Sequence, residues 1–161
     1  GLNGTYIGDV VINVDQSYII GSKNPLVVKI KNGKYKIASG PKKIVDALKK
    51  RRAESKKMIA IYEKNGSMPK SIISTYRKNF DNVGEFAINT NPKAKLSRYL
   101  IETEKIAKMM HIALGSGYEP SRETTYHCDI VLNCPRQKVD IWVKTPKGKV
   151  LWIMKKGNLV V

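Results

Sequence analysis

The chain has 161 residues, of which 30 are Lys or Arg and 13 are Asp or Glu, so its formal net charge is +17. Its apolar content of 42% is typical of a globular domain and too high for a disordered chain. Two cysteines exclude a disulfide-rich scaffold, and no apolar run approaches the roughly 18 residues of a membrane span. The chain opens on Gly1 without a signal peptide, so we expect a fragment of a longer protein.

Most of the excess charge lies between Lys29 and Lys78. This stretch has 16 basic residues against three acids, whereas the rest of the chain has 14 against 10. A basic patch can bind nucleic acid. However, Lys outnumbers Arg by 24 to 6 over the whole chain, and the stretch has few aromatic residues for base stacking. We therefore favour a solvated helix face, which is typical of a heat-adapted protein.

The first 38 residues are predicted to form strands. Short β-branched runs occupy residues 6–7, 10–14, 26–30 and 34–37. The last two runs flank Asn32-Gly33, which favours the positive φ angles of a hairpin turn. Helical spacing of apolar residues then predicts helices over residues 42–64 and 67–79. Residues 41–80 are therefore expected to form a basic helical insert.

The sequence of the second half of the chain predicts several short strands and one helix. Strands are expected at residues 85–89, 109–114, 126–132, 139–143 and 150–154, with a last short strand after Asn158. A helix is expected at about residues 95–108, with Glu102 and Glu104 on its surface. The chain, residues 1–161, is thus predicted to be a single α+β domain. Its sheet is expected to be mixed, largely antiparallel and barrel-like, with about three flanking helices.

The chain has two histidines, and one lies in the run Tyr126-His127-Cys128-Asp129. Residues i and i+2 of a strand point to the same face, so His127 and Asp129 project together. An imidazole beside a carboxylate suits a divalent metal ion. A structural His127–Asp129 ion pair explains the same pattern, and this pattern alone favours the ion pair.

Two more polar residues lie within apolar strands. His111 is followed by an apolar run, and the strand that carries His127 returns a short distance later. Glu85 is costly to bury unless it is paired or bound to a metal. Tyr118 can add a phenolic hydroxyl to such a site. We expect one pocket formed by the potential metal ligands Glu85, His111, His127 and Asp129, with Tyr118 at its rim.

Three segments carry a family resemblance: Gly-Glu-Phe-Ala-Ile-Asn-Thr-Asn-Pro at residues 84–92, Met-His-Ile-Ala-Leu-Gly at 110–115, and His-Cys-Asp at 127–129. In this order and at this spacing, the chain resembles the aminopeptidase T / aminopeptidase S family of dinuclear metallopeptidases. Asn3-Gly4-Thr5 and the Asn32-Gly33 hairpin also look like the start of the family's catalytic half. The resemblance covers nearly the whole chain and is most specific over residues 84–132.

The resemblance implies a metal-dependent aminopeptidase, a hydrolase in which two divalent ions activate a water that cleaves the peptide bond beside a free N-terminus. Glu85 matches the glutamate that bridges the two metals, His111 and His127 match histidine ligands, and Asp129 matches an aspartate ligand. Tyr118 matches an active-site tyrosine, so Tyr118 and Glu85 are the expected catalytic residues. The ions are expected to be Zn, Co, Mn or Mg, two in each intact site.

The family has one further glutamate ligand and an N-terminal α/β domain, which this sequence does not supply. The resemblance therefore implies the C-terminal catalytic part of such a protein, with an incomplete site. From these residues alone we expect weak binding of one ion and little peptidase activity.

Two other functions stay open. Related iron-dependent ring-cleaving dioxygenases use two histidines and one aspartate, and His111, His127 and Asp129 could form that triad. Glu85 favours the peptidase. The third function is a non-catalytic basic nucleic-acid-binding module, whose binding would weaken with salt.

The expected partners are a peptide substrate with a free N-terminus and the missing N-terminal domain of the parent chain. The resemblance also allows a homodimer. Binding to nucleic acid or to a membrane is not expected, and the expected location is the cytoplasm of a thermophile.

Overall fold

The computed structural model describes residues 1–97 and 100–160 and has the α+β architecture that the sequence predicts. The strands are β1 (Gly4–Gly8), β2 (Val11–Asn13), β3 (Ser17–Ile19), β4 (Leu26–Lys31), β5 (Lys34–Ser39), β6 (Val83–Ile88), β7 (Met109–Gly115), β8 (His127–Asn133), β9 (Ile141–Lys144), β10 (Val150–Lys155) and β11 (Asn158–Leu159). The helices are α1 (Lys42–Asn65), α2 (Lys70–Asn79), α3 (Leu100–Thr103) and α4 (Cys134–Gln137).

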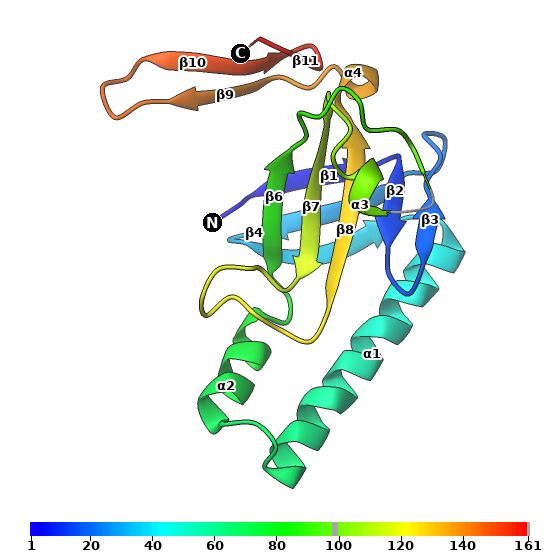
Figure 1. Cartoon of the computed structure of the whole chain (residues 1–161), viewed down its shortest axis with the longest axis vertical. Helices are drawn as coiled ribbons and strands as arrows, with labels where there is room; N and C mark the ends of the chain where they lie inside the picture. The colour runs from blue at the N-terminus through cyan, green and yellow to red at the C-terminus, as the bar shows by residue number, and fades with distance from the viewer. Residues whose placement is uncertain (98–99, 161) are drawn as a thin grey trace.

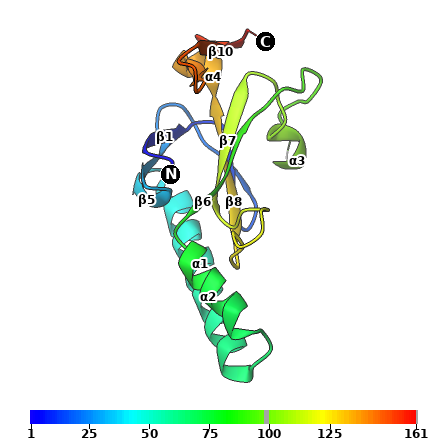
Figure 2. The same ribbon diagram turned by 90° about the vertical axis from the view of Figure 1, so that its left-hand side faces the viewer.

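A five-stranded antiparallel sheet in the order β3-β2-β8-β7-β6 forms the centre of the molecule. The three-stranded antiparallel sheet β1-β4-β5 crosses one of its faces (Figure 1). Side chains of both sheets, among them Leu26, Val28, Ile112 and Ile130, are fully buried in one apolar cluster. Burial of this apolar surface holds the two sheets together. The short helix α3 lies on the side of the opposite face of the five-stranded sheet (Figure 2).

The strands are divided among three sheets, whereas the sequence predicted one barrel-like sheet. The chain leaves the first sheet and joins the five-stranded sheet between β1 and β2. At this bend the backbone N–H groups of Asp9 and Val10 both donate to the Val131 carbonyl. Gly8 fits here because a Cβ on it would lie 2.2 Å from Cγ2 of Ile130. The sharp bend therefore gives consecutive strands to different sheets.

The basic stretch forms the two predicted helices, the second of which begins at Lys70. Helix α1 ends where Gly66 adopts a left-handed conformation with a φ of 65°, which a glycine reaches without strain. Together, α1 and α2 project from one end of the sheets (Figures 1 and 2). Within the described part of the chain, no helix combines the length and the apolar character needed to cross a bilayer.

Arg52 anchors α1 to the sheets. Its guanidinium donates hydrogen bonds to the hydroxyls of Tyr35 and Tyr126, and to the Asp81 carboxylate at 2.6 Å. It also lies over the ring of Phe80. The long basic helix is thus held by a half-buried cation as well as by its apolar residues.

The predicted helix over residues 95–108 is wrong for most of its length. Helix α3 spans only Leu100–Thr103, and residues 98 and 99 lie outside the described residues. The chain then pairs with Asn91, whose N–H donates to the Lys105 carbonyl at 3.0 Å and whose carbonyl accepts from Ala107 at 2.9 Å. Because these backbone groups bond to Asn91, they do not continue the helix.

The C-terminal strands form a small separate sheet in the order β11-β10-β9. It lies at the opposite end of the molecule from α1 and α2 (Figure 1). Met154 is fully buried and fixes its base to the core, whereas the hairpin beyond is exposed on both faces. Trp142 and Trp152 stand opposite each other across the two strands.

Candidate metal centre

Three neighbouring strands place four side chains on one face of the five-stranded sheet. Antiparallel pairing sets Ala113 of β7 opposite both Glu85 of β6 and Asp129 of β8, and sets Gly115 opposite His127. His111 lies two residues before Ala113 and therefore shares its face. The small side chains at positions 113 and 115 leave room for the four larger ones around them.

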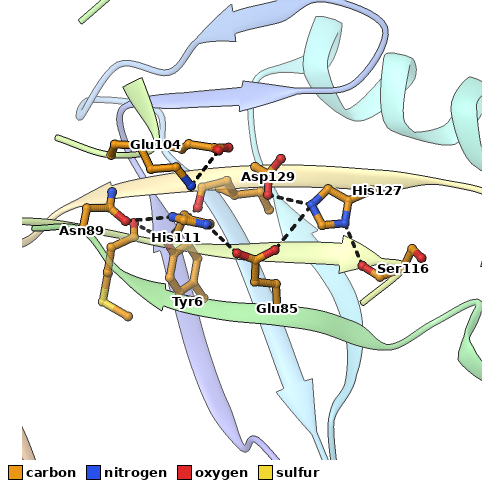
Figure 3. A network of polar contacts seen from close by, with 11 residues as sticks. Tyr6, Glu85, Asn89, Glu104, His111, Ser116, His127 and Asp129 are labelled. Atoms are coloured by element: carbon orange, nitrogen blue, oxygen red, sulfur yellow. Dashed lines mark hydrogen bonds and ion pairs between the residues drawn. The ribbon is translucent and has the colours of Figure 1, made fainter. Parts of the chain in front are cut away.

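The four side chains contact one another at the centre of this face (Figure 3). His111 Nε2 lies 3.1 Å from Glu85 Oε1, and His127 Nε2 lies 3.0 Å from Asp129 Oδ1. Glu85 Oε2 is also 3.7 Å from His127 Nε2, so this one carboxylate reaches both imidazoles. Ligand atoms of Glu85, His111 and Asp129 all lie within 4.8 Å of one another. The expected set of ligands is thus gathered at one place, while its role in binding metal stays a prediction.

The other nitrogen of each imidazole is bonded to an oxygen acceptor. His127 Nδ1 lies 2.7 Å from the Ser116 carbonyl, and His111 Nδ1 lies 2.8 Å from Asn89 Oδ1. Since a carbonyl oxygen can only accept, we assign the hydrogen to Nδ1 in both rings. Each Nε2, which faces the carboxylates, is therefore the atom left to bind a second proton or a metal ion. This arrangement is typical of histidine ligands oriented by an outer hydrogen bond.

Burial and charge act in opposite directions on His127. Burial alone lowers its pKa, but the hydrogen bond and charge of Asp129, the Ser116 carbonyl and the charge of Glu85 raise the pKa above its ordinary value. The Asp129 carboxylate is almost fully buried and His111 is only 2% exposed. Without a metal ion, His127 therefore holds its second proton more tightly than a free imidazole does.

Tyr118 lies at the rim of the cluster. Its ring centroid is 5.1 Å from that of His127, and the residue is 83% exposed. Partial burial and the charges of Asp129 and Glu85 raise the pKa of its hydroxyl, which therefore stays protonated near neutral pH. Tyr118 can donate a hydrogen bond to a bound molecule.

Sequence reasoning missed the residues that support the cluster. Asn89 continues the alternation of Glu85 along β6 and is buried, which the strand pattern could have shown. Ser116 acts through its backbone carbonyl, for which the sequence carries no signal. Glu104 was expected on a helix surface, but its side chain is only 15% exposed and pairs with Lys105.

No protein-family model, curated protein or solved structure matches this chain. The resemblance to the aminopeptidases therefore stays a prediction from the sequence.

Proposed function

We propose that the four clustered side chains bind a divalent metal ion in the site of a metal-dependent aminopeptidase. The contacts of the two ring nitrogens of His127 are the observation that supports this proposal most directly. Its Nδ1 hydrogen is used by the Ser116 carbonyl, so its Nε2 can face Asp129 at 3.0 Å only with a second proton or with a shared cation. Glu85 and His111 repeat the same combination of an imidazole and a carboxylate beside it.

The donor set fits a metal ion of the Zn, Mn or Co type. Two imidazole nitrogens and two carboxylates on rigid strands are ligands that these ions accept. Glu85, His111 and Asp129 bring their ligand atoms within 4.8 Å of one another, and His127 Nε2, 3.0 Å from Asp129, would add the fourth ligand atom. Such an ion lowers the pKa of a bound water and polarises a carbonyl group.

Side chains of this protein would supply proton transfer, a hydrogen bond to the substrate and the orientation of the ligands. The Glu85 carboxylate is less buried than that of Asp129 and reaches both imidazoles, so it is placed to accept a proton from an attacking water. Tyr118 can donate its hydroxyl proton to a substrate at the rim. Asn89 and Ser116 keep the two rings in position.

Glu85 also supports a hydrolase over the ring-cleaving dioxygenase. A facial triad of two histidines and one carboxylate keeps several positions on iron open for oxygen and substrate. In this chain a second carboxylate lies against both histidines and occupies part of that space.

The substrate that we propose is a peptide with a free N-terminus. A carboxylate of the centre could accept a charge-assisted hydrogen bond from an α-ammonium group, in contrast to the basic surface elsewhere. Cys128 and Cys134 are buried free thiols, which agrees with the cytoplasmic location that we propose.

A peptidase assay tests this proposal. The chain is incubated with leucyl peptides or their N-acetylated forms in the presence of Mn²⁺, Co²⁺ or Zn²⁺. We expect slow release of the N-terminal residue from the free peptides only, and its loss on addition of EDTA. Glu85→Gln should lower the rate by about a hundredfold or more, because it removes a carboxylate that is both a metal ligand and the proton acceptor.

Glu54→Gln is the matched control, since Glu54 is an exposed glutamate on α1. It should leave the rate unchanged. Equal rates for Glu85→Gln and the wild type, or no hydrolysis with any of the three ions, would overturn the peptidase proposal.

A further inference from the structure

A third carboxylate and an ammonium group lie next to the metal centre. Lys105 Nζ is 3.0 Å from Glu104 Oε1, and this pair follows directly after α3. Figure 3 draws Glu104 beside Asp129 and His111 on the same face of the sheet. The proposed function uses neither residue.

The backbone holds this pair in place. Asn91 accepts from Ala107 and donates to the Lys105 carbonyl, which ties residues 105–107 to the segment that follows β6. The same segment carries Asn89, which orients His111. The position of Lys105 is therefore coupled to the strand that builds the metal centre.

The charge of Lys105 acts on the centre itself. The hydrogen bond with Glu104 and the charges of Glu104, Glu85 and Asp129 raise the pKa of Lys105, so that it stays an ammonium group at neutral pH. The Glu104 carboxylate, being mostly buried, needs this cation as its partner. Glu104 thereby keeps the half-exposed ammonium group of Lys105 beside it, near enough to the centre for the charges of Glu85 and Asp129 to raise its pKa.

Charge balance then limits the number of metal ions. Glu85, Asp129 and Glu104 contribute −3, whereas Lys105 contributes +1 and one divalent ion contributes +2, which gives zero. A second divalent ion would leave a surplus of +2 in a partly buried site, where uncompensated charge is costly.

We infer that Lys105, held by Glu104, supplies the second positive charge of the centre, so that these residues bind one divalent ion and not two. This inference rests on the proposed function, because it assumes that Glu85, His111 and Asp129 bind metal. The resemblance implies two ions for an intact site and one for these residues, because a glutamate ligand is missing. This inference gives a separate reason for a single ion, which lies within this chain. Lys105 is a positioning residue, which acts on the ion through the electric field and not by contact.

Calorimetric titration with Mn²⁺ and with Zn²⁺ tests the inference without any assay of activity. The wild type and Lys105→Arg, which keeps the charge, should bind one ion each with similar affinity. Lys105→Gln should bind the first ion roughly tenfold more tightly and should take up a second, weaker ion, because a nearby positive charge is lost. Lys93→Gln, at an exposed lysine before α3, is the matched control and should behave as the wild type.

Glu104→Gln should have the opposite effect and weaken binding of the first ion, since it removes a negative charge from the centre. Lys105→Met repeats the neutral change with an apolar stem, in case Lys105→Gln does not fold. Two ions in the wild type, or equal affinities for the wild type and both neutral variants, would overturn the inference and leave the metal site standing. No binding by any variant would instead overturn the metal site, and this inference with it.

Discussion

At the scale of single residues, the state of the site depends on which imidazole nitrogen carries hydrogen. The amide oxygen of Asn89 and the backbone carbonyl of Ser116, both outside the cluster, accept from Nδ1 and so determine the tautomer of each ring. Their hydrogen bonds turn both Nε2 atoms toward the carboxylates. Residues that never touch the ion should therefore control its affinity.

Asn89→Ala tests the outer hydrogen bond to His111. With its Nδ1 acceptor lost, the ring is free to change tautomer and to rotate. We expect metal affinity to fall by about 10- to 100-fold, as is usual for such outer contacts. Titration calorimetry measures the loss, and Asn24→Ala in an exposed loop is the control. An affinity equal to that of the wild type would show that Asn89 does not orient the ligand.

The protonation of His127 should make the stability of the metal-free protein depend on pH. The pKa of His127 is raised in the folded chain, so the folded state holds the proton more tightly than the unfolded state does. The stabilisation is complete below the unfolded pKa of about 6.5 and is lost as the pH rises through the higher folded value. We therefore expect the free energy of unfolding, measured in urea without metal, to fall from about pH 6 to pH 8. His127→Gln should remove this fall, and an unchanged slope in that variant would contradict the assignment.

At the scale of elements, the site depends on how closely β6 approaches the loop after β7. A Cβ on Gly84 would lie 2.2 Å from the carbonyl oxygen of Ser116, the oxygen that holds His127. Only glycine at position 84 permits this contact. The residue next to Glu85 thus positions a ligand on another strand.

Gly84→Ala should separate β6 from this loop and displace both Glu85 and His127. We expect weaker metal binding together with a lower melting temperature, because the added methyl group meets backbone that cannot move aside freely. Gly21→Ala is the control, since nothing lies within 4 Å of a Cβ at that position. Metal binding unchanged in Gly84→Ala would show that this close approach does not matter for the site.

Local sequence patterns predicted the structure correctly where an element depends only on neighbouring residues. Alternating residues placed His127 and Asp129 on one face, and Asn32-Gly33 forms the predicted turn with φ angles of 52° and 78°. The pattern failed at residues 95–108, where pairing with Asn91 is a long-range contact that no local spacing records. Glu104 was misplaced for the same reason. Backbone acceptors such as the Ser116 carbonyl leave no trace in the sequence at all.

At the scale of the whole molecule, the C-terminal hairpin stands apart from the core. Both tryptophans of the chain lie on it, with Trp142 55% exposed and Trp152 37% exposed. Only the base of this hairpin is buried, at Met154. The tryptophans therefore report on the hairpin and not on the two central sheets.

Tryptophan fluorescence and circular dichroism should therefore report unfolding with very different changes in signal. We expect tryptophan emission to be that of solvent-exposed rings and to change little on unfolding, while far-ultraviolet circular dichroism shows the full cooperative loss of structure. Acrylamide should quench the emission of the folded protein nearly as well as that of the unfolded one. A large red shift on unfolding would show that the hairpin packs against the body of the protein.

In the site that we propose, His111 and His127 both bind one divalent ion through Nε2. They are the only histidines in the chain, so nuclear magnetic resonance of the imidazole nitrogens observes the site without interference. We predict that one equivalent of Zn²⁺ shifts both Nε2 signals strongly, while both Nδ1 atoms keep their hydrogens. Nε2 signals that do not respond to Zn²⁺ would contradict metal binding and show that the four side chains form only a cluster of ion pairs.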